Sequence, residues 1–371
     1  MYKVRRKRIG LIGSTGLVGK GALELLMEYS DMYQISLAGR SLDRMKNATK
    51  SFKNRYDIEY RLVDITNLVQ LESYIKECDV IVNCAGPVSV IGDSIAKICI
   101  KLGVELADAS CDQNLIEKID KLSKDATKNK VACVIAAGIY PGLTEIIPSY
   151  IMNDKLDFTK EINMFVTGTG KLSYNASYDI VNFISNSSGT NSNTLFTYIH
   201  NGKREKVMKY LRNKEFREPI NKKSIYPTIS DDFYNMAYKC NADSIYFYDA
   251  YLIPLINNRY ILDIDTEEKK KRAAKIMSER SECEREYSIF MAEAVGVKNN
   301  KKVEVSCEFT FDGSGESLTG MVAAAVGLDF IENGVTTYGC YCAYRNVKFG
   351  NIKSYLEKNN KVKIYEKERC I

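Results

Sequence analysis

The segment IGLIGSTGLVGKGA (residues 9–22) places three glycines at the junction between a short apolar run and an amphipathic stretch. Gly13 permits a tight turn after a strand, and Gly16 allows the backbone to approach a bound group closely. Gly19 lets the following helix pack closely on the strand. A glycine turn that binds nothing is the alternative, but the strand before the turn and the helix after it favour a binding turn.

The start of this helix is the expected position of a dinucleotide pyrophosphate, because unpaired N–H groups and the helix dipole favour anions there. Ser14 and Thr15 add hydroxyl donors. We therefore predict that one continuous run of residues contacts the pyrophosphate: Gly13, Ser14, Thr15, Gly16, Leu17, Val18 and Gly19.

Residues 1–142 alternate short apolar runs with amphipathic stretches, a pattern typical of a parallel sheet with crossover helices. This pattern predicts an α/β fold with a doubly wound, Rossmann-type sheet. The expected strands are residues 9–12, 34–38, 58–63, 80–83, 104–107 and 131–136. The expected helices are residues 18–29, 42–52, 68–76, 91–102 and 114–128.

After residue 142 the pattern becomes irregular and predicts a second, α+β domain over residues 143–315. The HNG turn at residues 200–202 indicates a hairpin. A charged helix is expected over residues 267–294, followed by a strand over 303–311 and a small-residue helix over 318–331.

The segment LAGRS (residues 37–41) closes the second expected strand, where the adenosine ribose lies in sheets of this type. An acidic residue at this point binds the ribose 2′-hydroxyl, whereas Arg40 can pair bidentately with a 2′-phosphate. Ser41 adds a hydroxyl and can also cap the next helix. A solvated arginine at a strand end is the alternative, but the position favours NADP over NAD.

Three further strand ends are expected to converge on the same cleft, since ligands bind beyond the carboxyl ends of the strands in open sheets. Asp64 and the backbone of Ile65 can contact adenine, although Asp64 can equally cap a helix. ELADAS places Asp108 and Ser110 near the same crevice. The turn expected beneath the nicotinamide ribose consists of Cys84, Ala85, Gly86 and Pro87.

The composition argues against several other functions. The 53 Lys and Arg against 47 Asp and Glu give a net charge of +6, too mild and dispersed to indicate nucleic-acid binding. Eleven scattered cysteines indicate a reducing compartment, so we expect a cytoplasmic location. The single histidine argues against a metal site, and no apolar run reaches the roughly 20 residues of a membrane-spanning helix. We expect the basic MYKVRRKR to be a solvated lead-in rather than a signal or an anion-binding arm.

Taken together, these segments resemble the NADP-binding domain of the saccharopine dehydrogenase-like oxidoreductases. The matching pieces are GSTGLVGKGALELL, LAGRSLDRM, LVDITN, CDVIVNCAGPVSVIGDSIAKICIKLGVELADAS and AAGIYPGLTEIIPSY. DGSGESLTGMVAAAVGLDFIENGV is similar to the family's late helix, so residues 316–371 are expected to return and complete the first domain, residues 1–142. The resemblance implies NADPH, a hydride step, and a second domain that covers the substrate and forms a homodimer through its sheet.

Two residues are the candidates for chemistry beside the cofactor. Asp108 can steady a cationic iminium, or it can cap the turn that follows it. Tyr140, in GIYPG, can face the cleft or pack between the domains. Four arginines of the second domain are possible clamps for a substrate carboxylate, with solvated surface charge as the alternative: Arg204, Arg212, Arg217 and Arg259. An aromatic run can line an apolar pocket or form a strand core: Tyr246, Phe247, Tyr248 and Tyr251.

The sequence therefore predicts an NADPH-dependent oxidoreductase that reduces a C=N bond in a small or carrier-linked metabolite. The alternatives are a C=C reductase of the enoyl type and an NADP-binding sensor without a catalytic step. The glycine motif does not separate them, because all three need it.

Overall fold

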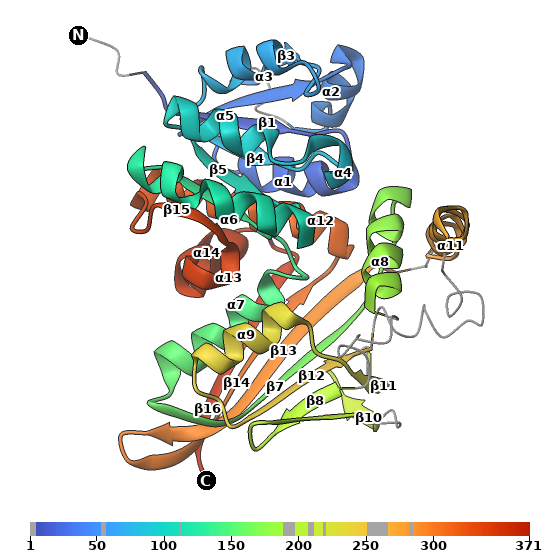
Figure 1. The fold of residues 1–371 in the computed structure, drawn as a ribbon, viewed down its shortest axis with the longest axis vertical. Coiled ribbons are helices and arrows are strands. Elements are labelled where there is room, and N and C mark those ends of the chain that lie inside the picture. The colour runs from blue at the N-terminus through green and yellow to red at the C-terminus, as the bar shows by residue number, and fades with distance from the viewer. Residues whose placement is uncertain are drawn as a thin grey trace. The chain divides into compact units, whose positions relative to one another are not determined.

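The computed structural model describes residues 5–52, 57–111, 113–187, 197–206, 211–217, 220–250, 266–281 and 285–371 (Figure 1). The chain divides into two compact units, residues 1–143 with 316–360 and residues 144–315 with 361–371. Each unit is built around its own sheet.

The first unit contains a seven-stranded sheet in which neighbouring strands run parallel, in the order β15-β6-β5-β4-β1-β2-β3. This arrangement confirms the predicted doubly wound α/β fold. Six strands agree closely with the predicted ones, and the seventh comes from the C-terminal segment. The strands are β1 (Arg8–Ile12), β2 (Gln34–Gly39), β3 (Glu59–Leu62), β4 (Val80–Asn83), β5 (Glu105–Asp108), β6 (Ala132–Ile135) and β15 (Gly339–Cys342).

Helices cover this sheet. The helix expected over residues 91–102 is α5 and begins at Ser94, and Gly92, which has φ 54°, separates it from the short helix α4, which was not predicted. The helices are α1 (Leu17–Met27), α2 (Leu42–Thr49), α3 (Leu68–Ile75), α4 (Val88–Ile91), α5 (Ser94–Leu102), α6 (Gln113–Lys128), α12 (Gly315–Asn333), α13 (Ala343–Asn346) and α14 (Phe349–Leu356).

Helix α12 lies in backbone contact with α1. A methyl group added to Gly320 would lie 1.8 Å from the Val18 carbonyl oxygen, and one added to Gly21 would lie 1.8 Å from the Ser317 carbonyl oxygen. Only glycine permits so close an approach at these two points. The helix that carries the glycine turn is therefore fixed by a segment about 300 residues later in the chain.

The second unit is built on a nine-stranded sheet with the path β10-β11-β12-β7-β13-β14-β16, in which β8 pairs with β12 and β9. The strands are β7 (Phe158–Thr169), β8 (Thr197–His200), β9 (Lys203–Lys206), β10 (Leu211–Glu215), β11 (Lys222–Pro227), β12 (Ser244–Asp249), β13 (Tyr287–Lys298), β14 (Lys301–Phe311) and β16 (Val362–Cys370). The helices are α7 (Leu143–Tyr150), the π-helix η2 (Ile151–Lys155), α8 (Tyr174–Ser187), α9 (Asp231–Lys239) and α11 (Glu267–Arg280).

Two expectations for this unit are resolved by its strand pairing. The hairpin at HNG is confirmed, since β8 and β9 pair across Asn201 and Gly202, which have φ 47° and 72°. The prediction of one helix over residues 267–294 is wrong, because α11 ends at Arg280 and β13 begins at Tyr287. Strand β13 pairs with β7 on one side and β14 on the other, and this pairing outweighs local helix propensity.

The last strand belongs to the second sheet. Strand β16 pairs with β14 from Val362 to Cys370, so residues 361–371 lie in the second unit, whereas the sequence pattern groups them with the first domain. The chain thus leaves the second sheet, contributes residues 316–360 to the first unit and returns to the second sheet.

Candidate functional site

The turn between β1 and α1 is closed by two glycines that no larger residue can replace without a shift of backbone. Gly13 has φ 86°, and a methyl group added to it would lie 2.7 Å from the Ala85 backbone nitrogen. A methyl group on Gly19 would lie 2.0 Å from the Gly13 carbonyl oxygen. The turn is therefore pressed against its own helix and against the loop that follows β4.

The third glycine of the motif faces open space. Gly16 is exposed, and the nearest non-adjacent atom to an added methyl group would be the Gly13 carbonyl oxygen at 3.6 Å. Helix α1 begins after Gly16 without a side-chain cap, which leaves the amides of its first turn available to an anion. The Ser14 hydroxyl is buried and has no partner among the described residues. These features fit a pyrophosphate. The other predicted contacts of the turn are half-buried: Thr15, Leu17 and Val18.

Arg40, Ser41 and Asp64 meet at the ends of β2 and β3. Arg40 is exposed and forms no ion pair with any residue that the structure describes. Ser41 caps α2 by accepting a hydrogen bond from the Arg44 amide at 3.4 Å. The Thr66 hydroxyl and amide donate to the Asp64 carboxylate and lower its pKa, and the positive charge of Arg40 lowers that pKa by a smaller amount. Arg40 is thus close enough to act on Asp64 electrostatically.

Asp64 does not cap a helix, which was one of its two expected roles, because Asn67 is the N-cap of α3. The Asp64 carboxylate closes the turn that precedes this helix. Its carboxylate lies 2.7 Å from the Thr66 hydroxyl and 3.0 Å from the Thr66 amide, while the Asp64 amide donates to the Gln70 side chain at 2.9 Å. Ile65 beside it is half-buried. Contact of Asp64 and Ile65 with adenine stays a prediction.

The ends of β4 and β5 are joined by a buried side-chain pair. Asn83 and Asp108 are register partners, and the Asn83 amide nitrogen donates to the Asp108 carboxylate at 2.9 Å. The second carboxylate oxygen accepts from the Ser110 amide at 2.8 Å. Asp108 is 5% exposed, and burial raises its pKa to about 6 against the effect of these hydrogen bonds. A carboxyl group shifted toward neutrality at the strand ends is typical of functional sites.

The turn after β4 is held from both sides. The Ala85 amide donates to the Asn83 side-chain oxygen at 3.1 Å, and the Cys84 amide donates to the last carbonyl of β1 at 2.9 Å. The Gly86–Pro87 peptide is cis, and α4 begins directly after Pro87. Burial raises the pKa of the Cys84 thiol, so this cysteine is neutral and unsuited to nucleophilic chemistry.

Tyr140 lies on a loop that is attached to the end of β5. The Ala137 amide donates to the Asp108 carbonyl at 3.0 Å, and the Ala136 amide donates to the Ser110 carbonyl at 3.0 Å. Tyr140 is half-buried and precedes a cis peptide to Pro141. The backbone thus brings this loop to Asp108, and a contact of the Tyr140 hydroxyl with substrate stays a prediction.

The sequence prediction does not assign a role to Asn83. The signal was a polar residue at the end of the apolar strand VIVN, but its partner lies 25 residues later. Only the register between β4 and β5 shows that the two side chains meet.

The candidate residues of the second unit are engaged within that unit. Arg217 pairs with Glu308 at 2.8 Å and lies 3.9 Å from the centre of the Tyr365 ring. Phe247 is buried in the core on β12, as the strand-core alternative predicts. Arg204 lies over the Tyr234 ring. Tyr251, Arg259 and the side chain of Arg212 lie outside the described residues.

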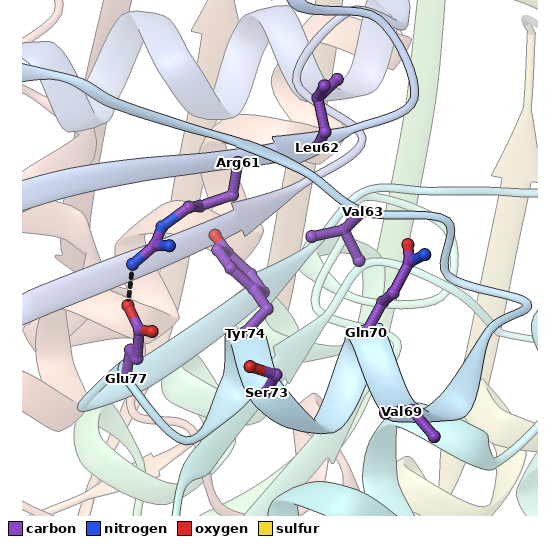
Figure 2. Close-up of a pocket in the computed structure, with 8 residues that line it drawn as sticks. All are labelled: Arg61, Leu62, Val63, Val69, Gln70, Ser73, Tyr74 and Glu77. Carbon is purple, nitrogen blue, oxygen red and sulfur yellow. Dashed lines mark hydrogen bonds and ion pairs between the residues drawn. The ribbon is translucent and has the colours of Figure 1, made fainter.

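A cavity of about 300 Å³ lies between β3 and α3, at the edge of the first sheet (Figure 2). Figure 2 shows Arg61 and Glu77 joined by an ion pair at one end of it. No residue predicted to bind the cofactor lines this cavity, although the lining residue Gln70 accepts the hydrogen bond from the Asp64 amide. Its lining residues are Arg61, Leu62, Val63, Val69, Gln70, Ser73, Tyr74 and Glu77.

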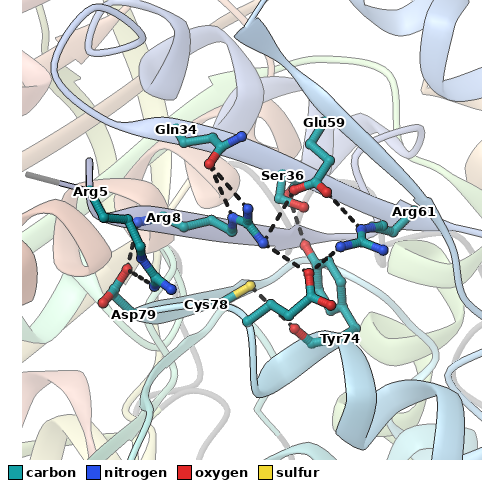
Figure 3. A network of polar contacts seen from close by, with 10 residues as sticks. Arg5, Arg8, Gln34, Ser36, Glu59, Arg61, Tyr74, Cys78 and Asp79 are labelled. Carbon is teal, nitrogen blue, oxygen red and sulfur yellow. Dashed lines mark hydrogen bonds and ion pairs between the residues drawn. The ribbon is translucent and has the colours of Figure 1, made fainter. Parts of the chain in front are cut away.

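Two arginines of the basic run pair with nearby carboxylates (Figure 3). Arg5 lies 2.9 Å from Asp79, and Arg8 lies 2.9 Å from Glu77 and 3.4 Å from Glu59. Arg5 is exposed, as expected for a solvated lead-in, whereas Arg8 belongs to β1 and its side chain is only 18% exposed. Both are engaged with carboxylates, which argues against an anion-binding arm.

The strand order β3-β2-β1-β4-β5-β6, with a glycine turn opening α1, is the arrangement of dinucleotide-binding Rossmann domains. The first unit therefore has the fold and the glycine turn of a dinucleotide-binding domain.

Comparison with known proteins specifies the kind of dinucleotide. Residues 9–134 match the family described as the saccharopine dehydrogenase NADP binding domain. The structure of apo saccharopine dehydrogenase (L-Glu forming) from Saccharomyces cerevisiae aligns with 98% of this chain and 100% of that chain, with a TM-score of 0.69 and 13% identity. Residues 9–134 therefore form a domain of the saccharopine dehydrogenase NADP-binding type, and the solved structure shows that the fold of the chain is shared. This result confirms the predicted family and cofactor.

The curated relatives match about a third of this chain. Trans-acting enoyl reductases of Mycobacterium tuberculosis and Mycobacterium bovis are 28% identical over 132 residues, which are 35% of this chain and 32% of theirs. A lipid droplet localized protein of Caenorhabditis elegans is 25% identical over 141 residues, which are 36% of this chain and 33% of that protein. The matching segment thus spans about a third of these relatives. In the described parts of the chain, every helix is too short or too polar for a membrane crossing.

Proposed function

We propose that the chain is an NADPH-dependent oxidoreductase that reduces a C=N bond of a small or carrier-linked metabolite. The NADP-binding family of the first domain and the uncapped start of α1 support cofactor binding. The observation that favours a C=N acceptor is the buried carboxyl group of Asp108 beside the turn at residues 84–87.

In this proposal, the residues at the strand ends bind different parts of the cofactor. Residues 13–19 hold the pyrophosphate, Arg40 and Ser41 bind the 2′-phosphate, and Asp64 with Ile65 borders the adenine. Residues 84–87 support the nicotinamide end. NADPH supplies a hydride when bound, and the protein contributes orientation and exclusion of water.

The charge of Asp108 distinguishes two kinds of acceptor. A protonated imine is positively charged, and an ionised carboxylate stabilises it and keeps the proton on nitrogen. A C=C bond conjugated to a carbonyl places negative charge on the carbonyl oxygen during reduction, which the same carboxylate opposes. With a pKa of about 6, Asp108 is mostly ionised at neutral pH and favours the C=N acceptor. We assign Tyr140 a contact with the substrate from the loop next to Asp108.

Reduction of a C=C bond is the second candidate. The match of about a third of the chain to proteins named trans-acting enoyl reductases favours it. In that case Asp108 would have to act in its protonated form, as a donor to the developing oxyanion. C=C turnover should therefore fall as the pH rises above about 6, whereas C=N turnover should be maintained.

The test measures NADPH oxidation with cyclic imines, with amine and keto-acid mixtures, and with enoyl thioesters. Turnover of a C=N substrate that falls at least about 100-fold in Asp108→Ala, with NADPH affinity retained, supports the proposal. Turnover of enoyl thioesters alone would establish the second candidate. Tight NADPH binding without any turnover would point to a sensor. We also propose a homodimer, which light scattering on the purified chain would reveal.

A further inference from the structure

Asn83 is completely buried, and its side-chain amide has a hydrogen bond at each end. The oxygen accepts from the Ala85 amide at 3.1 Å, and the nitrogen donates to the Asp108 carboxylate at 2.9 Å. An amide oxygen can only accept and an amide nitrogen can only donate, so these two partners fix the orientation of the group. A hydrophobic residue of similar size would remove the acceptor of the Ala85 amide and leave one oxygen of the buried Asp108 carboxylate without its donor.

Each partner of Asn83 connects to a further strand end. The backbone of Ala85 would lie 2.7 Å from a methyl group on Gly13, which places it directly against the phosphate-binding turn. Asp108 accepts from Ser110 through its side chain and from Ala137 through its carbonyl. A continuous set of contacts therefore runs from the turn after β1 to the loop after β6, with Asn83 at its centre.

We propose that Asn83 is a positioning residue: by joining Ala85 to Asp108, it holds the turn after β4 in the shape that receives the nicotinamide end of NADPH and fixes the direction of the Asp108 carboxylate. The inference rests on the proposed placement of NADPH at these strand ends. It does not depend on which bond the enzyme reduces.

The surroundings of Asp108 make this proposal testable by pH. The groups that act on its carboxylate are Asn83 and Ser110, and the thiols of Cys84 and Cys99 lie near enough to be affected by its charge. Burial raises the pKa of both thiols, so neither carries charge near neutrality. In Asn83→Asp a second carboxyl group replaces the donor that now faces Asp108, while the acceptor for Ala85 is kept. The substitution therefore keeps the bond to Ala85 and replaces the donor to Asp108 with a group that ionises as the pH rises.

The experiment measures NADPH affinity of the full chain by fluorescence titration between about pH 5.5 and pH 9. The affinity of each variant is divided by that of the wild type at the same pH, because the 2′-phosphate itself titrates near pH 6. At low pH the two carboxyl groups of Asn83→Asp share a proton and the hydrogen bond remains. As the pH rises the pair ionises and repels, so we expect the relative affinity to fall at least about tenfold. Asn83→Ala, which lacks both bonds, should bind weakly at every pH.

The exchanged double variant Asn83→Asp/Asp108→Asn restores the pair with donor and acceptor reversed. The carboxylate introduced on β4 would still accept from Ala85, and the amide oxygen introduced on β5 would still accept from Ser110. We expect NADPH affinity within about threefold of the wild type and no pH-dependent loss relative to it. Loss of C=N turnover in this variant, with NADPH binding intact, would show that the carboxylate must stand on β5, as the proposed function requires.

The matched control is Asn163→Asp in the second sheet, where the Asn163 amide donates to Glu161 at 2.8 Å. It creates a comparable pair of carboxyl groups in the second unit and should leave the pH dependence of NADPH binding unchanged. The proposal is overturned if the relative affinity of Asn83→Asp is constant with pH, or if the folded double variant fails to recover binding. Circular dichroism at each pH establishes that the variants are folded. If Asn83→Asp unfolds, NADPH binding by the double variant, which keeps all the hydrogen bonds, still tests the proposal.

Discussion

Arg40 is exposed at the end of β2 and acts electrostatically on Asp64 at the end of β3. A guanidinium in this position can form two charge-assisted hydrogen bonds to a 2′-phosphate. Arg40→Glu replaces that attraction with repulsion, so we expect NADPH affinity to fall about 100-fold while NADH affinity stays within about threefold. Fluorescence titration with the two cofactors measures both values.

Arg44 provides the control for this substitution. It is exposed on α2, and its contact with Ser41 uses its backbone amide rather than its side chain. Arg44→Glu makes the same change of charge about one helical turn away and should alter NADPH affinity less than about threefold, through screened long-range attraction only. Equal losses in the two variants would mean that Arg40 contributes general charge and does not contact the phosphate.

Glu105 should make the stability of the protein depend on pH. It begins β5, accepts a hydrogen bond from the Ala132 amide, and burial raises its pKa from 4.5 to about 7. Between these two values the folded state binds more protons than the unfolded state, so the contribution of Glu105 to stability is greatest below pH 4.5 and is lost as the pH rises through 7. Glu105→Gln keeps the acceptor for Ala132 and removes the charge. At pH 8 we expect the free energy of unfolding of Glu105→Gln to exceed that of the wild type by on the order of 1 kcal/mol, so that it unfolds at a higher urea concentration. At pH 5 we expect little difference.

Urea unfolding of the wild type, Glu105→Gln and Glu117→Gln at several pH values measures this effect. Glu117 is exposed on α6 and serves as the control for loss of a carboxylate. If Glu105→Gln and the wild type differ by the same amount at pH 5 and pH 8, the Glu105 carboxyl group titrates normally in the folded state.

At this scale the sequence was informative where one residue acts through local geometry. The three glycines of the first turn are each required by a positive φ, a close approach or an open binding surface within one short stretch of chain. Asn83 could not be assigned in the same way, because its role depends on which residue of β5 lies opposite it. Register between parallel strands is set by packing of the whole sheet and is not written in either strand alone.

Helix α12 packs against the backbone of α1 and so fixes the position of α1. A methyl group on Gly320 would overlap the Val18 carbonyl oxygen at 1.8 Å, and that atom belongs to the first turn of α1. Gly320→Ala must therefore move one helix away from the other, and we expect a loss of about 2 kcal/mol in stability together with at least about tenfold weaker NADPH binding. Thermal unfolding and fluorescence titration on the same samples measure both effects.

Gly350 in α14 is the matched position for this test. A methyl group there would have no neighbour within 4 Å, so Gly350→Ala should raise stability by about 0.5–1 kcal/mol through helix propensity and leave NADPH affinity unchanged. The importance of α12 for the cofactor would be disproved if Gly320→Ala lowered stability but the folded protein bound NADPH as tightly as the wild type.

Elements were predictable where their burial pattern is local. The strands and helices of residues 9–128 follow one another with regular spacing, and the strands are mostly buried except β3, which lies at the sheet edge. Strand β15 was not predicted, since its four residues GCYC become a strand only by pairing with β6, more than 200 residues earlier. The prediction of a helix over residues 267–294 failed for the same reason. Strand β13 forms by pairing with two long strands, β7 and β14, and this pairing cannot be read from its own sequence.

At the scale of the whole molecule, the chain passes between the two units three times. Residues 1–143 and 316–360 make one unit, and residues 144–315 and 361–371 make the other. The alternation of strands and helices along the sequence reveals the first sheet, but nothing local in residues 361–371 indicates which sheet they join. Their position follows from the register pairs between β14 and β16, which run from Val303–Cys370 to Phe311–Val362.

A chain that ends at residue 360 tests this division. It lacks β16, which is the edge strand next to β14, so the second unit loses its terminal ladder while every strand and helix of the first unit remains. We expect calorimetry to show a lowered transition for the second unit, with NADPH affinity within about threefold of the full chain. A chain that ends at residue 315 also lacks α12 and β15, and it should bind no NADPH because α1 loses the helix that packs on it. If removal of residues 361–371 alone abolished NADPH binding, the two units would have to fold as one cooperative body, and the cofactor site could not be attributed to the first unit by itself.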